Sequence, residues 1–120
     1  MFVDRRVLGL ERRRAARVPL VCAVRHHKAG KAHLCLAANI SQEGMEVIRV
    51  RDAPLAPRSE VTFEFELPGH RDLITAQGRV VFDRDGPRTG VAGVRFDAVS
   101  PEHARWIDEY VAKALRTADG

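Results

Sequence analysis

The sequence predicts an all-β fold with a C-terminal helix: a six-stranded antiparallel β-barrel behind a flexible basic N-terminal arm. Apolar and polar residues alternate in six segments between residues 18 and 96, which is the period of strands. Turn-forming residues separate the segments, and a helical period begins at Ser100. Closing six short strands into a barrel removes unpaired edges. The 120 residues suit one domain, divided into an arm (1–17), a barrel (18–99) and a helix (100–116).

Three strands form the first half of the predicted barrel. They cover residues 18–25, 32–40 and 45–50. Pro19 lies near the start of the first strand, where a missing N–H donor is tolerated. A hairpin loop at 27–31 contains Gly30, which can take a positive φ. The turn at 39–44 joins the second strand to the third.

Three further strands and the helix complete the fold. The strands cover residues 61–67, 73–83 and 90–96. In the longest of them, one face carries Ile74, Ala76, Gly78, Val80 and Phe82. Ser100 is a suitable N-cap and Pro101 suits the first helical position. The stripe of Ile107, Val111 and Leu115 is predicted to pack on the core.

The net charge of +4 is concentrated in the arm. Residues 1–17 contain six arginines against Asp4 and Glu11, so the remaining residues are neutral overall. A local arginine cluster indicates an anion-binding element, and arginine forks suit phosphates and guanine edges.

Other features favour ordinary interpretations. The sequence has no apolar run long enough for a membrane span and no signal-peptide core, so we expect a cytoplasmic protein without membrane insertion. Cys22 and Cys35 are expected to be reduced core residues. His26, His27 and His33 flank the first hairpin without a recognisable metal-ligand spacing, so we expect exposed loop residues and no metal.

Two short motifs stand out because they occur together. An Arg-x-x-x-Arg pair, Arg13 and Arg17, precedes the first strand. An Asn-x-Ser-x-x-Gly turn, made by Asn39, Ser41 and Gly44, follows the second strand. Each motif alone is weak, because arginine runs are often solvated and Asn, Ser and Gly are common in turns.

In this order, the two motifs resemble those of the PilZ domain family, small β-barrel receptors for cyclic di-GMP. The resemblance extends to Glu11–Leu20 at the opening, Arg79–Val81 in the central strand, Gly90–Phe96 in the closing strand and Ser100–Glu102 at the helix start. It implies a non-enzymatic receptor that needs no cofactor and relays the level of this second messenger to a protein partner, with outputs such as motility or exopolysaccharide.

The resemblance also assigns roles to site residues. Arg13 and Arg17 would hold phosphate and guanine, since guanidinium forks bond both bidentately. Asn39 and Ser41 would hydrogen-bond a guanine edge, and Gly44 would shape the turn. Arg12 directly precedes this pair, and relatives with arginine there tend to bind two intercalated ligands, so two per chain are expected.

Glu43 departs from the commoner family pattern, in which this position is often glycine. A positive φ at Glu43 would cost about 1 kcal/mol, and its carboxylate would repel phosphate if it faced the site.

Two alternatives to a cyclic di-GMP receptor remain open at this point. One is an adaptor that keeps the fold and does not depend on the nucleotide, which Glu43 favours and the intact motifs oppose. The other is a small-barrel nucleic-acid binder with a basic arm. Aromatic residues make up only 6% of the chain, which leaves few stacking platforms for bases and argues against nucleic acid.

Overall fold

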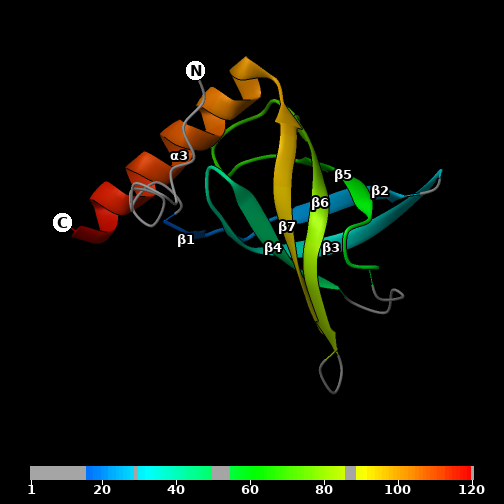
Figure 1. The fold of residues 1–120 in the computed structure, drawn as a ribbon. Coiled ribbons are helices and arrows are strands. Elements are labelled where there is room, and N and C mark those ends of the chain that lie inside the picture. The colour runs from blue at the N-terminus through cyan, green and yellow to red at the C-terminus, as the bar shows by residue number, and fades with distance from the viewer. Residues whose placement is uncertain (1–15, 29, 50–54, 86–88, 120) are drawn as a thin grey trace, which may run out of the picture.

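The computed structural model describes residues 16–28, 30–49, 55–85 and 89–119. These residues form strands wound into a barrel, with one long helix along its side (Figure 1). The elements are β1 (Val18–Pro19), β2 (Ala23–Lys28), β3 (Lys31–Ile40), β4 (Gly44–Arg49), β5 (Glu60–Phe65), β6 (Ile74–Asp85), β7 (Gly90–Val99) and α3 (Pro101–Asp119).

The sheet closes on itself as predicted. Its strand order is β1-β3-β2-β5-β6-β7-β4, and β4 also pairs with β3, which completes a ring of six strands. All pairings are antiparallel. Closure pairs the backbone N–H and C=O groups that the edge strands of an open sheet would leave without partners. The predicted barrel with a C-terminal helix is therefore confirmed.

The seventh strand arises because the first predicted strand is divided. β1 and β2 lie along the same edge of β3, with Val18 opposite Ile40 and Ala23 opposite Leu36. Between the two strands, the Leu20 N–H still donates to the Ala38 carbonyl at 3.3 Å. β1 and β2 therefore occupy one place in the ring.

A bulge interrupts the alternation of β3 near its end. Ala37 lies opposite Val47 and Asn39 lies opposite Glu46, so one extra residue, Ala38, is inserted relative to β4. Cys35 and Ala37 are buried before the bulge and Ile40 is buried after it. The inserted residue therefore takes Asn39 out of phase with the buried positions.

A second bulge corrects the prediction for the longest strand. Val80 lies opposite Val94 and Phe82 lies opposite Gly93, so Val81 is the extra residue of β6. Ile74, Ala76 and Val80 are in the core as predicted. Phe82 is not, because the bulge changes the phase of the strand after Val80.

The core fills the barrel and extends under α3. Phe63, Phe65, Leu20, Ile40 and Met45 are among its largest fully buried side chains. In α3, Ile107 and Val111 are buried and complete this core. The Ser100 Oγ accepts the His103 N–H at 3.2 Å, which is the predicted N-cap.

The prediction for Leu115 is wrong, because this side chain is 37% exposed. The last turns of α3 extend past the strands of the barrel (Figure 1). The apolar stripe of the helix therefore continues beyond the part of the barrel that could bury it. Within the described ranges, no helix is long and apolar enough to cross a membrane.

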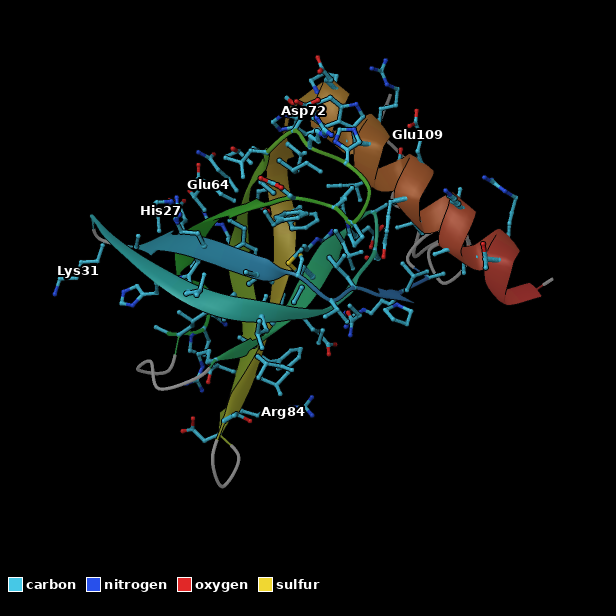
Figure 2. All side chains as sticks on the ribbon, turned by 180° about the vertical axis from the view of Figure 1, so that it is seen from behind. His27, Lys31, Glu64, Asp72, Arg84 and Glu109 are labelled. Carbon is cyan, nitrogen blue, oxygen red and sulfur yellow. The ribbon has the colours of Figure 1, made fainter. Side chains whose placement is uncertain are left out.

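The histidines near the first hairpin are not the exposed group that the sequence suggested. His26 is 1% exposed and stacks on His33 with ring centroids 4.9 Å apart. His27 on β2 pairs with Glu64 on β5, and Figure 2 shows the two side by side. The pairing of β2 with β3 continues as far as Lys28 and Lys31, so His26 lies within the sheet and not in the hairpin loop.

Of the two cysteines, Cys35 is buried in the core as expected, whereas Cys22 is only partly buried against it. Val24, rather than Cys22, lies opposite Cys35 across the strand pair. Burial raises the pKa of the Cys22 thiol. It also raises the pKa of Tyr110, whose hydroxyl donates to the Pro19 carbonyl at 3.2 Å and links α3 to β1.

Candidate functional site

Strand β1 brings Arg17 to the end of β3. Val18 pairs with Ile40 and Pro19 pairs with Asn39, so the residue before β1 lies beside the start of the Asn39–Gly44 turn. The Arg17 side chain is 49% exposed. Arg17, the described member of the first motif, therefore lies beside the second motif on the outer surface of the barrel.

The turn between β3 and β4 is held by Ser41. Its Oγ accepts the N–H groups of Glu43 at 3.1 Å and Gly44 at 3.2 Å. The Ser41 N–H donates to the Gly44 carbonyl at 2.8 Å. Ser41 is 3% exposed. Its hydroxyl thus fixes the turn, and the Glu43 carbonyl anchors it to β7 by accepting the Phe96 N–H at 2.7 Å.

Gly44 is required by the close approach of β7. A Cβ at this position would lie 2.2 Å from the Val94 carbonyl oxygen. Conformational freedom does not explain this glycine, because Gly44 lacks a positive φ. Arg58 is the non-glycine residue with a positive φ in the described part of the chain, so Glu43 carries no left-handed strain.

Asn39 presents its amide on the outer side of β3. Its Nδ2 donates to Glu46 Oε1 at 3.2 Å. Because a carboxylate can only accept, the amide nitrogen must face Glu46 and the Oδ1 atom must face away. This Oδ1 is buried and has no hydrogen-bond partner among the described residues. It is therefore an unused acceptor, which an N–H donor of a ligand reaches only if the groups that cover it move.

Glu46 joins the two motifs. While its Oε1 accepts from Asn39, its Oε2 pairs with Arg17 Nη1. No sequence motif includes this residue. Alternation in β4 places it on the outer face between buried Met45 and Val47, but contact with Arg17 depends on the pairing of β1 with β3.

An aromatic ring continues the same outer row. Gly93 on β7 lies opposite Glu46 on β4 and opposite Phe82 on β6. The Phe82 ring lies over Gly93, where a Cβ would come within 2.2 Å of ring atom Cε2. Arg84 Cζ lies 4.6 Å from the centroid of this ring. Phe82 could not be identified from the sequence, because strict alternation places it on the same face as Ile74, Ala76 and Val80.

A further cation lies beside the turn. Arg95 is exposed on β7 and lies directly opposite Gly44 on β4. Arg12 and Arg13, the remaining predicted site residues, lie outside the described residues. The described residues contain no group of three side chains suited to hold a metal ion.

The arrangement presents cationic, amide and aromatic groups on one surface. Guanidinium groups can bond anionic oxygens and stack on planar rings. The Oδ1 of Asn39 is an acceptor without a partner among the described residues, and the Phe82 ring adds an apolar group to the same row. These groups suit a ligand that combines negative charge with planar, hydrogen-bonding rings.

The family model for the PilZ domain matches residues 11–113 of this sequence, and the chain belongs to the PilZ domain family. The comparison with curated protein sequences gives no match.

Solved structures share the fold. The PilZ domain of Escherichia coli YcgR, solved with c-di-GMP, is 18% identical, with a TM-score of 0.69 over 89% of this chain and 94% of that one. Bacillus subtilis MotI/DgrA, an inhibitor of motility, is 17% identical, with a TM-score of 0.77 over 88% of this chain and 52% of that one. The K. pneumonia MrkH complex with c-di-GMP is 18% identical, with a TM-score of 0.71 over 90% and 54%. This chain thus spans about half the length of MotI/DgrA and MrkH.

Proposed function

We propose that this protein is a non-enzymatic receptor for cyclic di-GMP that acts in the cytoplasm. The observation that carries the proposal is the meeting of Arg17 with the Asn39–Gly44 turn on the outer face of the barrel. Membership of the PilZ family supports it. So do the c-di-GMP complexes of YcgR and MrkH, which have the same fold.

In the proposed complex, the arginines of the first motif bind phosphate and guanine. Arg17 supplies one guanidinium from the described site, and Arg12 and Arg13 supply others from the preceding segment. Asn39 accepts a guanine N–H through its Oδ1, which has no partner among the described residues and is uncovered when the ligand binds. Ser41 contributes by holding the turn, because its hydroxyl already accepts two backbone N–H groups.

Calorimetric titration tests the proposal with cyclic di-GMP, GTP and a short oligonucleotide as ligands. Arg13→Ala and Arg17→Ala should each weaken cyclic di-GMP binding by about 1.5–3 kcal/mol, the scale of a hydrogen bond to a charged group. Ser41→Ala should weaken it less. Wild-type affinity in both arginine variants would contradict the proposed site, and preference for the oligonucleotide would indicate a nucleic-acid binder.

A nucleotide-independent adaptor is the second candidate function. The observation that favours it is the Glu46 carboxylate, which already engages Arg17 and Asn39. The same titration separates the two candidates, since an adaptor of this kind would take up no cyclic di-GMP.

We also propose that the signal passes to a protein partner through the outer face of β2 and β3. Exposed apolar side chains lie on this face of β3, with Leu34 63% and Leu36 46% exposed, and such patches are typical of interaction surfaces. Leu34→Ser should preserve cyclic di-GMP affinity and remove ligand-dependent cross-links formed in cells at this surface. Unchanged cross-links would place the partner elsewhere.

A further inference from the structure

The Glu46 carboxylate occupies groups that the proposed ligand requires. Its Oε2 pairs with Arg17 Nη1, and its Oε1 accepts from Asn39 Nδ2 at 3.2 Å. The Glu46 side chain is 24% exposed, so it lies partly within the surface. The Glu46 carboxylate thus lies between Arg17 and Asn39, in the position that the anionic group of a ligand would take.

Alternation in β4 and the strand register fix the position of Glu46. Its neighbours Met45 and Val47 are buried, which directs Glu46 to the outer face. Across β4 it lies between Asn39 on β3 and Gly93 on β7. The bulge at Ala38 brings the Asn39 amide to the same face.

We infer that Glu46 is an internal counter-anion, which holds Arg17 and Asn39 in the ligand-free protein and releases them when cyclic di-GMP binds. This inference rests on the proposed function. Phosphate and carboxylate oxygens are both acceptors, so they compete for the Arg17 guanidinium. Glu46 thereby raises the concentration of ligand at which the receptor responds.

A different role for Glu46 gives the opposite result. A carboxylate can also accept N–H groups from a guanine edge, in which case Glu46 would stabilise the complex. Removing its charge would then weaken binding, whereas removing a competing counter-anion strengthens it.

The test compares wild type with Glu46→Gln and Glu60→Gln by calorimetric titration with cyclic di-GMP. Glu60 is a matched control, because it also forms a cross-strand pair with an arginine, Arg79, at 2.9 Å. It lies on β5, three strands from β4 in the ring. Glu46→Gln should lower the Kd about two- to fivefold, the scale of an exposed ion pair. Glu60→Gln should leave the Kd unchanged.

Thermal unfolding without ligand provides a second readout. Glu46→Gln should lower the Tm while it strengthens ligand binding, because it removes a contact of the free protein. Added salt should reduce the difference in Kd between wild type and Glu46→Gln, since it screens exposed charges.

The outcomes separate this inference from the proposed function. If wild type binds cyclic di-GMP and Glu46→Gln binds equally or more weakly, the counter-anion role is wrong. If all three proteins fail to bind, the proposed function is wrong and the inference fails with it.

Discussion

Gly44 lies where two strands come closest together. A Cβ there would lie 2.2 Å from the carbonyl oxygen of Val94 and 3.3 Å from the Cα of Arg95. Both obstacles are backbone atoms, which cannot rotate away as the end of a side chain can. A substitution at Gly44 must therefore move β4 or β7, and with it the turn that carries Ser41.

Gly44→Ala should lower the free energy of unfolding by about 1–3 kcal/mol, the usual cost of overpacking. Urea denaturation measures this change. Gly30→Asn is the control, because Gly30 has a φ of +78° with open space around it, and asparagine tolerates this conformation. An equal loss of stability in both variants would contradict the role assigned to the β7 backbone.

At the residue scale, the sequence predicted the members of the turn better than their roles. Asn39, Ser41 and Gly44 could be identified because turn chemistry depends on residues close in sequence. The close approach of Val94 to Gly44 and the pairing of Arg17 with Glu46 could not, because both depend on contacts between distant strands.

At the scale of elements, two single-residue bulges determine which side chains face outward. The bulge at Val81 in β6 turns Phe82 out of the core and Asp83 inward. Asp83 Oδ2 accepts from Arg49 Nε at 2.7 Å and from the Leu55 N–H at 2.9 Å. The hydrogen bonds and charge of Asp83 raise the pKa of the buried Arg49 guanidinium, which stays protonated.

Asp83→Ala should lower the free energy of unfolding by about 3–5 kcal/mol, because it removes the buried carboxylate that accepts from both Arg49 Nε and the Leu55 N–H. Asp85→Ala is the matched control, since Asp85 also bonds Arg49, at 2.7 Å, but is 70% exposed. This variant should cost about 1 kcal/mol or less. Urea denaturation of the two variants checks the difference, and similar losses would argue against the inward role of Asp83.

Alternation alone could not reveal these bulges. The sequence of β6 continues its apolar period through Phe82, so the inserted residue leaves no local signal. The six places in the ring and the start of α3 were predictable, because turn residues and the Ser100 cap act locally. The change of face after Val80 depends on pairing with β7.

At the scale of the whole molecule, the proposed receptor brings the segment before β1 to a fixed turn on the barrel. Saturation with cyclic di-GMP should give two ligands per chain. Two stacked ligands bring four phosphate charges together, and a further guanidinium from Arg12 helps to neutralise them and can stack on a guanine.

The calorimetric ratio measures this stoichiometry. Arg12→Leu should lower it from two to one without abolishing binding, while Arg14→Leu should keep it at two. A ratio near one for the wild type that is unchanged in Arg12→Leu would show that the stoichiometry is wrong.

Hydrogen exchange with and without cyclic di-GMP tests the central claim most directly, because it reports on both motifs at once. The proposal predicts new protection around residues 12–17 and in the turn at 39–44 when the ligand binds. The core strand around Val61–Leu67 should change little, since its apolar residues are already buried. Equal protection of both motifs with and without saturating ligand would contradict the account.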